Sequence, residues 1–173
     1  MSANADSINK ARNYAYLLLK FRLRSEKEIS DRLKRKKFTP EVIRKTLQFL
    51  REKGFINDFE FARSWVNSRV KKPLGILRLK QELKVKGINP DIAEAVLKDL
   101  KSNYAEEKIV RELAQEKFKR IKGAEEKKKR RVFNYLLRRG FSPAAIIGSL
   151  TVSYTHLRAH ETSLHLVCRL LLE

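Results

Sequence analysis

The sequence predicts an all-α fold, arranged as an elongated array of three tandem three-helix repeats. Three observations lead to this prediction. A helix-start motif occurs three times at nearly constant spacing, apolar residues recur at helical intervals around it, and no stretch shows convincing strand alternation. The chain has 173 residues, of which 42% are hydrophobic, so it has enough apolar side chains to bury a core.

The helix-start motif is anchored on three prolines, Pro40, Pro90 and Pro143, which are separated by 50 and 53 residues. Thr, Asn or Ser directly precedes each proline, an apolar residue lies two positions before it, and a Leu lies seven positions before and after it. The capping side chain accepts a hydrogen bond from a free backbone N–H, and proline at the first helical position gives up an N–H that has no partner there. Four coincident positions in three copies favour a true repeat over helix starts that merely look alike. Unrelated solenoids of helix pairs have mostly shorter periods, about 33 to 47 residues.

The first repeat is expected over residues 1–54, beginning with a long helix at about 8–23. Ser25 and Glu28 have the spacing of a capping box, which predicts a middle helix starting there. Lys37 stands at the turn before the third helix, where a left-handed backbone is expected and glycine would cost less.

The second repeat is expected over residues 55–103. Its first helix covers about 58–71, and either Asn57 or Asp58 can cap it. A middle helix follows, with apolar residues three and seven positions after Ile76, and the motif proline begins the third helix.

The third repeat is expected over residues 104–150, with a first helix at about 105–121. Gly140 suits the left-handed turn before the last helix, which begins at Pro143. The repeat pattern still holds at Leu150 but not beyond it, so we expect this last helix to be truncated.

Residues 151–173 are expected to be a non-native tail. Ser153 stands where the first two repeats carry Leu50 and Leu100, and the last lysine of the chain is Lys129. The segment "VSYTHLRAHETSLHLVCRLLLE" resembles a translated sequencing-adapter or vector sequence. It also holds every histidine and the single cysteine of the chain, and no zinc site is expected from them; the residues concerned are His156, His160, His165 and Cys168.

Charge is the strongest functional signal. The formal net charge is +20, from 40 Lys and Arg against 20 Asp and Glu, and the tail contributes nothing to it. Such an excess predicts a polyanionic partner, most often nucleic acid. If the repeats stack, their basic middle helices could form one positive stripe along a phosphate backbone, giving salt-sensitive binding. The candidate contact residues are Arg24, Arg32, Lys34, Arg35, Lys36, Lys37, Arg69, Lys71, Lys72, Arg78, Lys80, Lys84, Lys86, Lys127, Lys128, Arg130 and Arg131.

Signals of catalysis are missing from residues 1–150. This region has no histidine, no cysteine and no glycine-rich phosphate loop, so neither an enzymatic activity nor a cofactor nor a metal is expected. No stretch approaches the roughly 20 apolar residues of a membrane span, and the N-terminus has no signal-peptide layout. One cysteine cannot form an internal disulfide, which favours the reducing cytoplasm.

The stretch "GFINDFEFARSWVNSRVKKPLGILRLKQELKVKGI", residues 54–88, resembles the core of the RecX family, regulators of the RecA recombinase. The resemblance covers about residues 10–150 and includes "AYLLLKFRLRSEKEISDRLKRKKF" in the first repeat. From the residues alone, Trp65 is expected in the core rather than as a base-stacking surface. The family-motif positions, taken as mainly structural, are Asp58, Phe61, Ala62, Trp65, Gly75, Leu79, Glu82, Leu83 and Gly87.

The resemblance implies three tandem three-helix repeats and a non-enzymatic modulator that binds RecA filaments and usually inhibits them. The expected partners are the RecA filament and single-stranded DNA, with double-stranded DNA as a second candidate, and the expected state is a monomer. Two other functions remain open. One is an architectural protein that binds DNA or RNA without sequence specificity and without RecA, and the more remote one is a nuclease.

Overall fold

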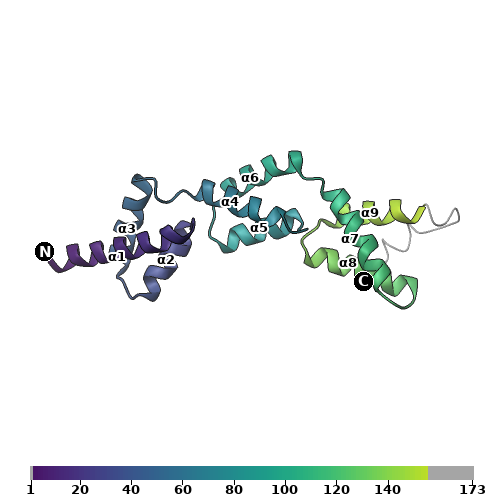
Figure 1. Ribbon diagram of the computed structural model, residues 1–173, viewed down its shortest axis with the longest axis horizontal. Helices are drawn as coiled ribbons and strands as arrows, with labels where there is room; N and C mark the ends of the chain where they lie inside the picture. The colour runs from purple at the N-terminus through teal and green to yellow at the C-terminus, as the bar shows by residue number, and fades with distance from the viewer. Residues whose placement is uncertain (1, 156–173) are drawn as a thin grey trace. The chain divides into compact units, whose positions relative to one another are not determined.

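The computed structural model describes residues 2–155 of the chain, and within this range it contains nine α-helices and no β-strand (Figure 1). Three consecutive helices form each repeat, which confirms the predicted all-α fold of three-helix repeats. The helices are α1 Ser2–Phe21, α2 Glu26–Arg35, α3 Pro40–Glu52, α4 Asp58–Val70, α5 Ile76–Val85, α6 Pro90–Asn103, α7 Glu106–Arg120, α8 Glu125–Arg138 and α9 Pro143–Thr155.

The first helix is longer than the sequence indicated. α1 begins at Ser2 rather than near residue 8, because residues 2–7 contain no proline or glycine to stop it. It ends at Phe21, where the chain turns back and Arg24 Nε donates a hydrogen bond to the Leu18 carbonyl at 3.1 Å. The bounds of α4 and α7 agree with expectation to within one residue.

The capping side chains behave as their positions predict. Thr39, Asn89 and Ser142 each accept a hydrogen bond from a backbone N–H in the first turn of the following helix, at 3.5, 2.8 and 3.2 Å. Asn57 caps α4 by accepting from the amides of Phe59 and Glu60, which leaves the neighbouring Asp58 carboxylate available for another contact.

The turn before each third helix closes in the same way in all three repeats. The residue with a left-handed backbone is Lys37, Gly87 or Gly140, with φ of 61°, 79° and 82°. Its amide bonds back to the carbonyl three residues earlier, and the next amide bonds to the carbonyl five residues earlier, as in Phe38 to Leu33 at 3.3 Å. This is a Schellman turn, in which the residues at the two ends of the longer bond also pack together. It explains why an apolar residue and a Leu recur at fixed distances before each proline.

Each repeat has its own apolar core. In the first, Ile29, Leu33 and Leu50 are fully buried. In the second, Phe61, Ala62, Leu79 and Leu83 lie in one buried cluster, as do Val132, Leu136, Phe141 and Ile146 in the third. Within the described part of the chain, the buried clusters of repeats 2 and 3 each stay within one repeat, whereas the cluster of repeat 1 also includes Ile56, from the segment between α3 and α4.

The chain divides into two compact units rather than three. Repeats 1 and 2 belong to one unit, which ends at Tyr104, and repeat 3 forms the other, which starts at Ala105. Within the first unit, the Tyr104 hydroxyl donates to the Leu74 carbonyl at 2.8 Å, so the end of α6 is tied to the loop before α5.

In repeat 3, α9 packs on α7 and continues to Thr155, past Leu150 where the repeat pattern stops. Its 13 residues match the length of α3. The histidines and the cysteine of the expected tail lie outside the described residues.

Candidate nucleic-acid interface

The start of α2 meets the end of α5, and this contact joins repeat 1 to repeat 2. The Ser25 hydroxyl donates to the Lys86 carbonyl at 2.7 Å, and Lys27 Nζ donates to the Val85 carbonyl at 3.1 Å. Carbonyls at a helix end have no partner within the helix, so these side chains complete the end of α5 from another repeat. The two middle helices therefore meet end to start, which also brings opposite ends of their dipoles together.

Glu28 links three segments at the same contact. Its carboxylate accepts hydrogen bonds from Arg22 at 3.0 and 3.1 Å and from Lys86 Nζ at 2.5 Å. The expected capping box is therefore only half formed, because Ser25 Oγ accepts from the Glu28 amide while the carboxylate binds these two cations. Burial by itself raises the pKa of Glu28, but the hydrogen bonds from Arg22 and Lys86 outweigh it and hold the pKa below its ordinary value.

Asp58 and Gly87 complete this inter-repeat joint, which we define as Ser25–Glu28, Asp58 and Val85–Gly87. The Asp58 carboxylate accepts from the Glu26 amide at 2.9 Å, so it serves the start of α2 rather than its own helix. Gly87 faces Lys27 so closely that an added Cβ would lie 2.5 Å from the Lys27 Cβ. Both family-motif positions are thus explained by contact between repeats.

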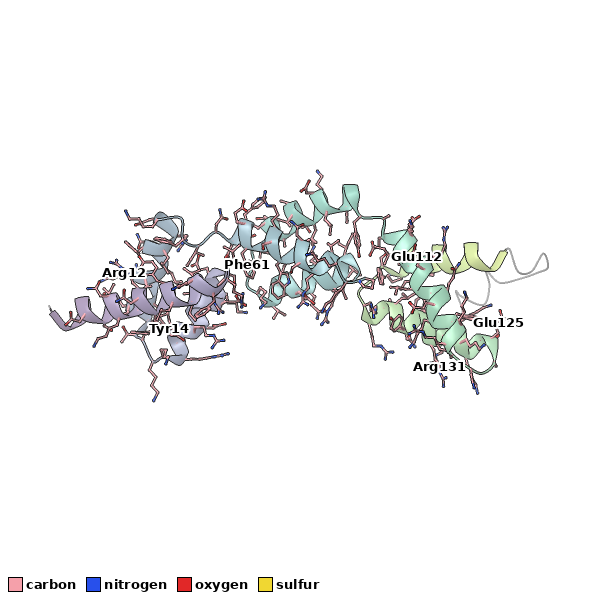
Figure 2. All side chains as sticks on the ribbon, viewed as in Figure 1. Arg12, Tyr14, Phe61, Glu112, Glu125 and Arg131 are labelled. Atoms are coloured by element: carbon pink, nitrogen blue, oxygen red, sulfur yellow. The ribbon has the colours of Figure 1, made fainter. Side chains whose placement is uncertain are left out.

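A second polar cluster surrounds Trp65. The indole Nε1 donates to Glu82 at 3.1 Å, and Arg69 Nε lies 2.9 Å from the same carboxylate, in an ion pair without the angle of a directed hydrogen bond. The Arg69 guanidinium and the Lys86 ammonium lie 4.6 and 4.4 Å from the indole centroid. Trp65 also packs against the core of repeat 2, next to Phe61, which Figure 2 labels on α4. The ring is thus half-buried, with one part packed on the core and held by these polar groups and another part lining the pocket described next.

This cluster borders an open pocket of about 280 Å³, lined by Trp65, Arg69, Arg78, Gln81, Glu82, Val85 and Lys86. Arg78 reaches the Glu82 carboxylate at 3.5 Å, so a single acid is shared by two arginines. The pocket wall keeps an excess of positive charge, which suits a phosphate at its mouth.

Seven of the predicted contact residues have partners inside the protein. Arg69, Arg78 and Lys86 belong to the clusters above, and Arg24 is tied to the Leu18 carbonyl. Burial lowers the pKa of the Arg24 guanidinium, and the nearby Arg22 charge adds to this effect. The remaining three are held by an acid or a ring: Lys80 by Glu94 at 2.7 Å, Lys36 by the Tyr14 ring and Lys128 by the Phe118 ring.

The other ten predicted contact residues are exposed, and within residues 2–155 their side chains make no hydrogen bond, ion pair or ring contact. They gather at the end of α2, along the loop before α5 and on α5 itself, and on α8, where Figure 2 labels Arg131. These free cations are Arg32, Lys34, Arg35, Lys37, Lys71, Lys72, Lys84, Lys127, Arg130 and Arg131. Long cationic side chains that are not committed elsewhere can bind phosphates with little rearrangement.

The remaining family-motif positions lie in the core of repeat 2 or next to it. Leu79 and Leu83 are fully buried in repeat 2, and Gly75 is the buried residue that precedes α5. The sequence offered no sign that Lys27 and Glu28 would contact the second repeat. The only local signal, the capping-box spacing, describes contacts within one helix.

No group of three metal-ligating side chains occurs in the portion of the chain that the structure describes. In that same portion, no helix combines the length and apolar character needed to cross a bilayer.

Comparison with known proteins covers all three repeats. Three family models match, described as the first, second and third three-helix domains of RecX, at residues 11–50, 57–97 and 105–147. A protein named Regulatory protein RecX from Chlorobium phaeobacteroides is 38% identical over 138 residues, covering 79% of this chain and 89% of the relative. A protein of the same name from Prosthecochloris aestuarii is 35% identical with the same coverage.

Two crystal structures also resemble the chain. One, described as regulatory protein RecX, has a TM-score of 0.76 at 26% identity and covers 83% of this chain and 71% of that one. The other, RecX from Lactobacillus salivarius, has a TM-score of 0.75 at 28% identity and covers 85% of this chain and 96% of that one.

Proposed function

Because the chain belongs to the RecX family of regulatory proteins, we propose that it regulates RecA by binding the filament that RecA forms on single-stranded DNA. Bound there, it limits filament extension and lowers the recombinase and ATPase activities of RecA. It acts in DNA repair and recombination, in the cytoplasm, as a monomer, without an enzymatic activity of its own.

The observation that supports this proposal best is the division of the basic residues into two groups. Ten predicted contact residues are exposed without partners in the described range, whereas seven are held by partners within the protein. A stable protein does not need so many unpaired cations, and each one raises the repulsion between like charges. Their availability is what contact with a phosphate backbone requires.

A RecA ATPase assay on single-stranded DNA tests the proposal. Added at a stoichiometric amount and low salt, the protein should slow ATP hydrolysis and shorten the filaments seen by electron microscopy. Unchanged hydrolysis and unchanged filament length under these conditions would sink the proposal.

Neutralising the free cations tests which surface meets DNA. Replacing Lys71, Lys72 and Lys84 by Gln should weaken binding and make it less sensitive to salt. The negative slope of log K against log salt should become shallower by about 2, since each lost phosphate contact on a single strand contributes about 0.7. The matched control replaces three lysines that are paired with acids, Lys45, Lys80 and Lys129, which changes the net charge equally. Equal losses in both variants would mean that net charge alone, rather than these positions, governs binding.

A second candidate function is supported by the same free cations. They would also allow binding to any DNA or RNA strand without RecA, as an architectural protein does. Titration against RecA filaments and bare single strands at several salt concentrations separates the two. Equal affinity for both at every salt would favour the architectural function.

A further inference from the structure

Five large apolar side chains are exposed around one junction of the first unit, where α1 ends and α4 begins. Eight such side chains are exposed in the described residues, so this junction holds most of them. Phe21 is the most exposed, at 82%, and Leu17, one helical turn before it, is exposed at 58%. We call the five residues the apolar patch: Leu17, Phe21, Leu23, Phe55 and Phe59.

Contacts within the protein bring the two halves of the patch together. The Tyr16 ring, next to Leu17, meets the Phe55 ring edge to face at 5.2 Å. The hydrogen bond from the Glu26 amide to Asp58 holds the segment after Phe21 against the start of α4. Residues 17–23 and 55–59 therefore lie at one place on the surface of the first unit.

Such a patch is unusual on a chain with so many charges. An apolar side chain left in water gives up the stabilisation that burial would provide, and grouped exposed apolar side chains mark contact surfaces. Charged residues make up 35% of the chain, so a group of exposed apolar side chains is not what its composition leads one to expect. The patch is therefore best explained by a surface that covers it in a complex.

The charges around the patch indicate what kind of surface that is. Lys20 and Lys53 stand beside it, both exposed and without a partner in the described range. The nearby acids already have partners within the protein: Glu26 has Arg51, Glu28 has Arg22 and Lys86, Glu60 has Arg63, Glu52 has Gln48, and Asp58 has the Glu26 amide. The surroundings are thus positive, which matches a partner that combines apolar side chains with carboxylates.

Two other occupants fit less well. A second copy of the chain would bring two molecules of formal charge +20 together. A nucleic-acid strand would stack its bases on aromatic rings, but two of the five patch residues are leucines, and the free cations suited to phosphates cluster on other elements.

We infer that the apolar patch is the protein-contacting surface of this chain and binds an apolar groove bordered by carboxylates on a subunit of the RecA filament. This inference rests on the proposed function and adds a division of labour to it. The apolar patch contacts protein, the free cations contact DNA, and preference for the filament over bare DNA comes from the patch.

The test uses the full chain with Leu17→Gln and Phe21→Gln together, because Gln is polar and still favours a helix. Affinity for the RecA filament on single-stranded DNA should fall roughly tenfold or more, as for loss of a central apolar contact. Affinity for the same strand without RecA should stay within about twofold, because no cation is removed. The matched control is Leu77→Gln with Leu137→Gln, two exposed apolar residues outside the patch, at 52% and 37%, which should leave both affinities unchanged.

Every other outcome overturns the inference. Unchanged filament affinity in the patch variant means that the patch touches nothing in the complex. Equal losses for filament and bare strand mean that the patch stacks bases. If sedimentation shows that the wild type is a dimer and the variant a monomer, a second copy covers the patch.

The folding control is the melting temperature. A melting temperature that matches the wild type shows that the fold of the double variant is intact, and Phe21→Gln alone is used if the double variant melts at a lower temperature.

The wild-type comparison separates this inference from the function on which it rests. If the wild type does not bind the filament more tightly than the bare strand, the proposed function fails and the inference falls with it. If the wild type prefers the filament and the patch variant keeps that preference, the inference alone is wrong.

Discussion

Lys37 has a left-handed backbone conformation, and at the equivalent positions of the other two repeats the residue is glycine. Its φ of 61° lies in the left-handed region, where an ordinary residue loses about 1 kcal/mol or more relative to glycine. Lys37→Gly should therefore raise the free energy of unfolding by up to about 1 kcal/mol, with part of the gain offset by the flexibility of glycine in the unfolded chain. Urea denaturation measures it, and a clear loss of stability would contradict this account.

Gly87 is constrained twice, by its backbone and by its neighbour. Gly87→Ala should destabilise by about 2–3 kcal/mol, because alanine disfavours a φ of 79° and its Cβ would collide with the Lys27 stem. Gly54→Ala is the matched control, since Gly54 has a φ of 70° but no atom within 4 Å of an added Cβ. Equal losses in the two variants, measured in urea, would show that the contact with Lys27 adds nothing.

At the scale of single elements, the inter-repeat joint depends on an ionised carboxylate. The pKa of Glu28 is depressed in the folded protein, so ionised Glu28 stabilises the fold fully above its unfolded value near 4.5. That contribution should disappear as the pH falls below about 4.5 and through the lower folded-state pKa. At neutral pH, Glu28→Gln should cost about 1.5–3 kcal/mol, typical of hydrogen bonds to a charged group.

Urea denaturation of wild type and Glu28→Gln between pH 7 and pH 3 measures this effect. The difference between the two should be largest near neutral pH and shrink toward zero in acid. Glu41→Gln is a suitable comparison, because Glu41 is exposed and its ion pair is with Lys45 on the same helix. A difference for Glu28→Gln that does not change with pH would rule out its carboxylate as the cause.

The elements themselves could be predicted from sequence because their signals are local. Caps such as Thr39, the proline after each cap and the left-handed turn residue all act within a few positions along the chain. The inter-repeat joint could not be predicted, because it depends on how repeats 1 and 2 pack. Glu28 looked like half of a capping box, and Asp58 looked like a possible cap, until the neighbouring repeat was in place.

The same reason explains why the sequence could not divide the candidate contact residues into paired and free cations. The sequence shows where the basic residues are along the chain. Only the folded chain shows that Lys86 and Arg69 form ion pairs with acids, while the side chains of Lys71 and Lys72 have no partner in the described residues. Exposure of Phe21 was equally invisible, because an apolar residue at the end of an amphipathic helix is usually expected to be buried.

For the molecule as a whole, we propose that residues 1–150 contain the functional protein. A chain ending at Leu150 should bind RecA filaments like the full chain and melt within a few degrees of it. A chain ending at Ser142 lacks α9 and the buried Ile146, so its third repeat should unfold, which circular dichroism would show as a loss of helix. Loss of filament binding on removal of residues 151–173 alone would contradict the proposal that this tail is not part of the functional protein.

The apolar cores of repeats 1 and 2 are largely separate, and this has a mechanical consequence for the first unit. Repeats 1 and 2 meet mainly through hydrogen bonds at the inter-repeat joint, and the apolar part of their contact is Ile56 and the ring pair of Tyr16 and Phe55, so separating the repeats exposes little apolar surface. When the inter-repeat joint opens, water can replace each of its hydrogen bonds, whereas water cannot replace the packing of an apolar core. Bending or twisting at the inter-repeat joint therefore costs less free energy than unfolding either repeat, and it is reversible. The two repeats of the first unit can therefore change their relative angle without either of them unfolding.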